Sequence, residues 1–145
     1  MKIEQQLLAS ELYGEKRNKK DIKYIVVQDI GNKHSPHYIV YEGKAIQKIP
    51  DDYASDSVNG CRLNRFGYLH GICTKYNSIS IGIPSKMLTE SKEMCVNLIM
   101  TLKQRYKISD DNIIRQMDIT GELNPVCWHE FKTWERDVIN KLIEI

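Results

Sequence analysis

The chain has 145 residues, of which 41% are hydrophobic and 28% are charged, as is ordinary for one soluble globular domain. Its formal net charge of +2 is too small to indicate a nucleic-acid partner. No hydrophobic run approaches the roughly 20 residues of a membrane-spanning helix, and the polar N-terminus lacks the apolar core of a signal peptide. We therefore expect a protein without a membrane span that is cytoplasmic as synthesised.

The first 20 residues divide into an apolar part and a basic part. Residues 3–12 carry isoleucine and leucine at a helical spacing, which predicts a helix. Residues 16–20 contain four lysine or arginine side chains, which is typical of a solvated loop. We expect this N-terminal helix and basic loop to precede a core of residues 21–145, all within a single domain.

Three strands are expected in the next part of the chain. Residues 23–29 are rich in β-branched and aromatic side chains, and their apolar centre does not alternate with polar residues, which predicts a buried central strand. Residues 37–41 and 44–49 flank a Glu-Gly pair, which is a typical hairpin signal.

A polar stretch and a further strand precede the long helix. Residues 50–77 are polar and contain several glycines, so we expect mostly loop, and residues 78–83 form a strand that ends at Pro84. Thr89 is expected to cap a helix that runs to about residue 106. The buried stripe of this helix is expected to be Met94, Leu98, Ile99 and Leu102.

The C-terminal part predicts a short strand at residues 112–116 and a last helix at about 128–143. The complete order of helices and strands indicates an α/β fold, with a central mixed β-sheet flanked by helices. The side chains of the last helix that we expect to face the core are Phe131, Trp134, Val138 and Leu142.

Five segments resemble, in order and spacing, the motifs of one protein family. Residues 24–32 resemble its strand and turn YIVIHxTGN, and residues 37–40 resemble its hairpin strand HYVV. Residues 69–81 resemble its NSxSIGIE strand and the preceding loop, residues 115–121 resemble RHxDVTG, and the Asn-Pro pair at 124–125 falls on Cys-Pro or Asp-Pro. Nearly the whole chain thus resembles the type 2 N-acetylmuramoyl-L-alanine amidases, which include phage endolysin amidases and animal peptidoglycan-recognition proteins.

The resemblance implies the chemistry of that family as well as its fold. Its active members cut the bond between the lactyl group of muramic acid and the first alanine of the peptidoglycan stem peptide. A zinc ion activates the attacking water. Two histidines and a cysteine or aspartate hold this zinc and leave its fourth position open.

The three zinc-ligand positions of the family fall on neutral amides in this chain. The resemblance places the two histidines on Gln28 and Gln116 and the third ligand on Asn124. Zinc in proteins takes imidazole nitrogen, thiolate or carboxylate, whereas a carboxamide oxygen is a weak donor to it. We therefore expect no bound metal, no cofactor and no intact catalytic site.

Further positions depart from the family in ways that bear on catalysis and binding. Glu122 stands where many members have a lysine that stabilises the oxyanion, and Gly82 stands where the family has a glutamate for proton transfer. Only residues 33–36 separate the first motif from the hairpin strand, where active relatives insert a helix or a long loop. The polar side chains expected at the groove, and therefore as ligand contacts, are His37, Thr74, Asn77, Ser78 and Asp118.

The histidines and cysteines are the remaining candidates for metal chemistry. A substitute metal site would have to use the histidines, and His37 is the best of them because it is expected on a strand that faces the groove; a lone histidine is more often structural. The others are His34, His70 and His129. The cysteines form no Cys-x-x-Cys pair, so we expect free thiols at Cys61, Cys73, Cys95 and Cys127.

The sequence favours a catalytically degenerate amidase-like domain, a pseudoenzyme that binds peptidoglycan or a muropeptide without zinc-dependent hydrolysis. Two alternatives stay open. One is an active amidase that lyses the cell wall with a rearranged site, and the other is an amidase fold reused to bind a partner protein. A bacterial or phage origin is expected, with access to the cell wall through a holin-type or lysis route.

Overall fold

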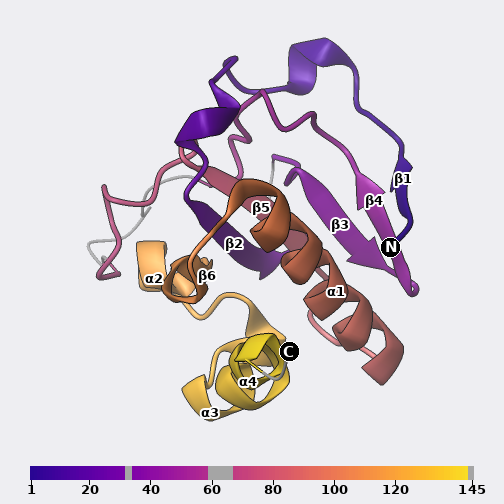
Figure 1. Ribbon diagram of the computed structural model, residues 1–145, viewed down its shortest axis with the longest axis vertical. Helices are drawn as coiled ribbons and strands as arrows, with labels where there is room; N and C mark the ends of the chain where they lie inside the picture. Colours follow the sequence, from indigo (N-terminus) through magenta and orange to yellow (C-terminus); the bar gives the residue numbers. More distant parts are fainter. Residues whose placement is uncertain (32–33, 59–66, 144–145) are drawn as a thin grey trace.

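The computed structural model describes residues 1–31, 34–58 and 67–143. In these ranges the chain forms a six-stranded mixed sheet that carries helices, as the sequence predicts. The strands are β1 (Ile3–Gln5), β2 (Tyr24–Asp29), β3 (Tyr38–Tyr41), β4 (Lys44–Gln47), β5 (Ser78–Ile83) and β6 (Ile113–Arg115). Their order across the sheet is β1-β4-β3-β5-β2-β6 (Figure 1).

The central strand β2 lies between β5 and β6 and is parallel to both. Val26 and Val27 have no exposed surface, which confirms the predicted buried strand. The predicted hairpin is also confirmed, because β3 and β4 pair antiparallel. Its turn residues Glu42 and Gly43 have φ values of 51° and 72°, and the tight turn that matches the twist of the strands requires positive φ at both positions.

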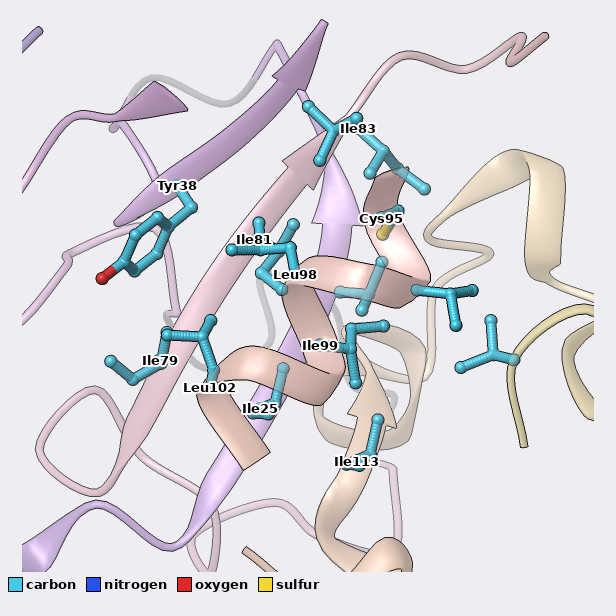
Figure 2. Close-up of a cluster of buried hydrophobic side chains, with 14 of the residues drawn as sticks. Ile25, Tyr38, Ile79, Ile81, Ile83, Cys95, Leu98, Ile99, Leu102 and Ile113 are labelled. Carbon is cyan, nitrogen blue, oxygen red and sulfur yellow. The ribbon is translucent and has the colours of Figure 1, made fainter. Parts of the chain in front are cut away.

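The long helix α1 (Thr89–Tyr106) crosses one face of the sheet and forms the main core with it (Figures 1 and 2). Leu98, Ile99 and Leu102 are fully buried, as predicted, whereas Met94 is only partly buried. The prediction that Thr89 caps the helix is wrong. The cap position falls on Leu88, which makes no side-chain capping hydrogen bond.

A short helix, a 3-10 turn and a longer helical segment complete the C-terminal part. They are α2 (Met117–Thr120), η4 (Val126–Trp128) and a continuous run of α3 (Phe131–Trp134), the π-helical turn η5 (Glu135–Ile139) and α4 (Asn140–Ile143). Trp134, Val138 and Leu142 are buried as predicted, but Phe131 is 62% exposed. Trp128 from η4 fills the core instead, with its ring 5.6 Å from that of Trp134.

The N-terminal segment is a strand where the sequence predicts a helix. β1 pairs parallel with β4, and the backbone N–H groups of Gln6 and Leu8 continue this pairing with the carbonyls of Gln47 and Lys48, both at 3.0 Å. Only the 3-10 turn η1 (Ser10–Leu12) is helical in this region. The free edge of β4 offers backbone groups that an extended segment satisfies and a helix cannot, which outweighs the helical spacing of the leucines.

Three of the predicted free thiols lie within the described residues. Cys73 and Cys95 are buried, Cys127 is half-buried, and all three are free. Cys61, as well as Asn32 and Lys33 of the short connection, lies outside the described residues. No helix of the described part combines the length and apolar character needed to cross a membrane.

Candidate functional site

Hydrogen bonds of the backbone and of the Asn124 side chain bring the three positions assigned to the family's zinc ligands together at the carboxyl end of β2. The N–H of Gln116 donates to the carbonyl of Val27 at 2.9 Å, and the N–H of Asp29 donates to Oδ1 of Asn124 at 2.8 Å. Gln28 lies between these two anchored residues. The N–H of Met117 donates to the carbonyl of Asn124 at 2.9 Å, which joins the second position to the third.

The two glutamines at this point are buried. Gln28 is 1% exposed and Gln116 is 6% exposed. Among the described residues, neither amide atom of Gln28 has a hydrogen-bond partner, and neither does Oε1 of Gln116. Nε2 of Gln116 makes a long contact of 3.5 Å with the carbonyl of Ser57.

Two hydrogen bonds between Asp29 and the segment Asn124–Val126 fix the third position. Oδ1 of Asn124 accepts from the N–H of Asp29, and the Asp29 carboxylate accepts from the N–H of Val126, at 3.0 Å from Oδ2. Burial raises the pKa of Asp29, and the hydrogen bond from Val126 opposes this shift. The amide oxygen of Asn124 thus already accepts a backbone hydrogen bond that holds this loop beside β2.

His37 lies on the sheet face away from α1 and is completely buried. Its Nδ1 accepts from the N–H of Ser80 at 3.1 Å, so the other nitrogen, Nε2, carries the proton and donates to the carbonyl of Tyr53 at 2.7 Å. Burial and the positive Arg17, whose Nη2 is 3.2 Å from Nε2, lower the pKa of His37 to about 4. His37 is therefore neutral near pH 7 and does not face an open groove as expected.

Residues 51–58, which we call the cover, pass over this face of the sheet. Val58 packs against Val26 in a small apolar cluster, and the Oγ of Ser57 donates to the Oγ of Ser80 at 3.4 Å. The Oγ of Ser55 donates to the carbonyl of Ser35 at 2.6 Å. The cover therefore encloses the polar side chains of this face.

Asp51 anchors the start of the cover. Its carboxylate accepts hydrogen bonds from the hydroxyls of Tyr38, at 2.6 Å, and Tyr106. Arg105 adds an ion pair at 3.3 Å. These contacts attach the cover to β3 and to the end of α1.

Arg17, expected in a solvated loop, is instead buried beneath the cover, at 9% exposed. Its guanidinium donates to the backbone carbonyls of Asp51 at 3.0 Å, Lys75 at 2.9 Å and Ser78. Desolvation lowers its pKa to about 10, so it stays charged near neutrality. The sequence of the basic residues 16–20 does not indicate that Arg17 alone points into the protein.

Gly82 pairs with Gln28 across the strands β5 and β2. A Cβ atom added to Gly82 would lie 2.7 Å from Cγ of Pro36 and 3.1 Å from Cγ1 of Ile30. The short connection before β3 therefore closes the space that a glutamate would need. Glu122 follows Gly121, the C-cap residue of α2, and is half-buried.

The other expected ligand contacts do not gather around Gln28. Thr74, Asn77 and Ser78 lie at the amino end of β5, where the N–H of Thr74 donates to Oδ1 of Asn77 at 2.8 Å and the Oγ of Ser78 donates to the carbonyl of Thr74 at 2.7 Å. This end is separated from Gln28 by the length of the strand, about 13 Å at roughly 3.3 Å per residue. Asp118 is closer, in α2, and accepts from the N–H of Arg115 at 2.9 Å.

Sequence reasoning missed the serines that complete the polar face. Ser80 lies on β5 between Ser78 and Gly82, and its hydroxyl contacts both His37 and Ser57. The alternation of small polar residues along an otherwise apolar strand was the available signal. It indicates that one face of a buried strand carries hydrogen-bonding groups.

The residues present do not fit a zinc ion. Within the described ranges, no group of three or more histidine, cysteine, aspartate or glutamate side chains could hold a metal. The side chains at the three ligand positions are carboxamides, Oδ1 of Asn124 already accepts from the N–H of Asp29, and the Asp29 carboxylate accepts from the N–H of Val126. His37 is enclosed, and Nδ1 of His129 lies 2.7 Å from the carbonyl of Val126.

Solved structures with this architecture cover almost the whole chain. The structure of PlyL has a TM-score of 0.77 and 21% identity, and the match covers 98% of this chain and 97% of that chain. The PlyG catalytic domain has a TM-score of 0.75 and 22% identity over 99% and 94% of the two chains. The N-acetylmuramoyl-L-alanine amidase LysC from Clostridium intestinale has a TM-score of 0.66 and 10% identity over 94% and 96%. This chain has the N-acetylmuramoyl-L-alanine amidase fold.

The expected fold is thereby confirmed, and it is shared at low sequence identity. No protein-family model matches the sequence, and no curated protein does. The amidase fold accounts for the convergence of residues 28, 116 and 124, because this architecture places the end of β2 beside β6 and the loop before Pro125.

Proposed function

We propose that this amidase-fold domain binds peptidoglycan and does not hydrolyse it by a zinc-dependent reaction. The observation that carries the proposal is the set of three carboxamides at the carboxyl end of β2, of which Asn124 is held by Asp29 and Gln28 and Gln116 are buried. Such a set neither binds zinc strongly nor lowers the pKa of an attacking water.

Peptidoglycan binding is supported by the fold that the chain shares with PlyL and with the amidase LysC. Binding without hydrolysis requires the surface of this fold that contacts the wall, and it does not require a metal ion. The enclosed polar face and the closed space at Gly82 argue against an active site rearranged around new ligands.

The test combines wall binding with hydrolysis. The full chain should sediment with purified bacterial cell wall and release no stem peptide, measured as newly formed alanine amino groups. Release that a chelator abolishes would contradict the non-hydrolytic part of the proposal. Failure to sediment with walls of several compositions would contradict the binding part and favour a protein partner.

Zinc content is measured on the same sample. Elemental analysis after mild dialysis should find far less than one zinc per chain. The matched control is the variant Gln28→His, Gln116→His, Asn124→Cys, in which the same backbone carries the family's ligands. Stoichiometric zinc in the unmodified protein would contradict the proposal.

A further inference from the structure

Cys95 and Cys127 lie in the same apolar core, on the side of the sheet that α1 covers. Cys95 has no exposed surface, and the half-buried Cys127 of η4 packs against the core cluster that contains it. Cys73 is separated from both, because it belongs to the small cluster with Val26 on the opposite face of the sheet. Of the three cysteines that the structure describes, Cys95 and Cys127 are therefore the pair that shares a core.

The neighbours of these two cysteines meet at one carboxylate oxygen. Oδ2 of Asp137 accepts a hydrogen bond from Nε1 of Trp128 at 3.0 Å and from Nζ of Lys92 at 3.4 Å. Trp128 directly follows Cys127 in η4, and Lys92 lies one turn before Cys95, on the same side of α1. The Asp137 carboxylate therefore holds η4 against the turn of α1 that carries Cys95.

The acid–base properties of the two thiols agree with this proximity. Burial raises the pKa of Cys95, and the charge of a Cys127 thiolate raises it further, an effect of groups that are close together. Burial and the negative Asp29 raise the pKa of Cys127 to about 11. Both side chains are therefore protonated thiols near neutrality.

We propose that Cys95 and Cys127 form a disulfide in an oxidising environment, and that this bond joins η4 covalently to α1. In a reducing compartment the two thiols persist. The bond adds a covalent link to the hydrogen bonds by which Asp29 holds the segment Asn124–Val126 beside β2. η4 is a single turn of three residues, so it can make the small adjustment that disulfide geometry requires. The inference does not depend on peptidoglycan binding.

The oxidant is a small disulfide, for which oxidised glutathione is the probe. The Cys127 thiolate attacks one sulfur of the oxidant, which forms a mixed disulfide and releases one glutathione thiolate. The Cys95 thiolate then attacks the sulfur of Cys127 and releases the second glutathione. The protein gives up two electrons and two protons, which the oxidant gains as it becomes two thiols. Cys127 reacts first because it is half-buried, whereas Cys95 is enclosed.

The test incubates the folded full chain with oxidised glutathione at about pH 8.5, where thiolate is more abundant than at neutrality. Remaining thiols are then alkylated in denaturant, and the tryptic peptides are mapped. The four cysteines fall in four different tryptic peptides, so each pairing gives a distinct product. The expected product joins residues 93–103 to residues 116–132, and Cys73 is recovered in alkylated form.

Oxidation of the unfolded chain in urea is the control, and it should give a mixture of pairings. The same mixture from the folded protein would overturn the inference, because the fold would then not select the pair. A stable glutathione adduct at Cys127 beside an alkylated Cys95 would overturn it as well, since the second exchange step would not occur.

Thermal unfolding of the same samples measures what the bond does. The oxidised protein should melt about 5–15 °C above the reduced protein, because the cross-link restricts the unfolded chain. A reducing agent should reverse this shift. The variant Cys127→Ser should show no shift on oxidation, whereas Cys73→Ser, at the cysteine on the other sheet face, should keep it. If a serine variant does not fold, the peptide map and melting shift of the unmodified protein still decide the matter. A cross-linked protein that melts below the reduced one would contradict a bond that the fold accommodates.

Discussion

Gly82, at the carboxyl end of β5 and paired with Gln28 of β2, has no space for a side chain. A Cβ there would lie 2.7 Å from Cγ of Pro36. Side chains cannot approach this closely without movement of the neighbour. The position that the family uses for a glutamate is therefore a packing contact in this chain.

Gly82→Ala should destabilise the protein by about 1–3 kcal/mol, the usual cost of overpacking. Urea unfolding monitored by tryptophan fluorescence measures the change. In a Pro36→Ala background the same substitution should cost clearly less, because the contact atom is gone. Equal costs in the two backgrounds would show that Pro36 does not close this space.

His37 gives the fold a defined pH dependence. Its pKa is about 4 in the folded protein and about 6.5 when unfolded, so the unfolded state binds more protons between these values. The stability associated with neutral His37 is present above about pH 6.5 and is lost as the pH falls toward 4. The loss should be on the order of 3 kcal/mol at most.

Unfolding free energies at pH 7.5 and pH 4.5 test this pH dependence. His37→Gln should flatten the difference, whereas His129→Gln, at a partly exposed histidine, should leave it intact. A difference that persists in His37→Gln would assign the pH dependence to other groups.

At the scale of elements, Arg115 of β6 adds polar contacts to the apolar packing that holds the C-terminal helical run to the sheet. Nη1 of Arg115 donates to the carbonyls of Trp128 at 3.1 Å and His129 at 2.9 Å, and its guanidinium lies 5.8 Å from the ring centroid of Trp134. A planar guanidinium can donate to both carbonyls while its plane stacks near the ring, whereas an ammonium is a compact point charge without a stacking plane.

Arg115→Lys should therefore destabilise the protein by roughly 1–3 kcal/mol. Hydrogen exchange should become faster in residues 126–143 before it does in β2. The exposed Arg136→Lys is the matched control and should change neither quantity appreciably. Uniform loss of protection throughout the sheet would contradict a local docking role for Arg115.

The elements that could be predicted from sequence are those whose own residues determine their structure. β2, β5 and α1 have apolar patterns that suit only a buried strand or a helix with one buried face. β1 could not be predicted, because its conformation is set by the edge of β4, which is distant in sequence. The cover was missed for a similar reason, since a polar loop sequence does not reveal which sheet face it encloses.

At the scale of the whole molecule, the motif order predicted the amidase fold and the convergence of residues 28, 116 and 124. The prediction that Thr74, Asn77 and Ser78 lie near these three residues was wrong, because they lie at the opposite end of the parallel strands. A motif match shows which residues are close in sequence. It does not show how far apart they lie across the sheet, which depends on the end of the strand at which each residue stands.

Restoring the family's ligands tests how far the backbone alone supports metal binding. The variant Gln28→His, Gln116→His, Asn124→Cys should gain measurable zinc binding, because two bonds between backbone groups, Gln116 to Val27 and Met117 to Asn124, hold the three positions together without the substituted side chains. It should release little stem peptide from cell walls, since Glu122 is negative at the position that the family resemblance assigns to an oxyanion-stabilising lysine, and a lost oxyanion donor alone costs about 10²–10³ in rate. Wall hydrolysis comparable to that of an active amidase would show that the zinc ligands are the only missing parts.

The two hydrogen bonds that join Asp29 to Asn124 and Val126 also connect a strand to a loop mechanically. In a metalloenzyme of this architecture, an ion shared between strand and loop fastens them together as well as performing chemistry. Here the fastening consists of two hydrogen bonds, from the N–H of Asp29 to Asn124 and from the N–H of Val126 to Asp29. Such a joint needs no supply of metal and cannot be extracted by a chelator, so the folded protein should keep the same melting temperature in EDTA as in zinc-containing buffer.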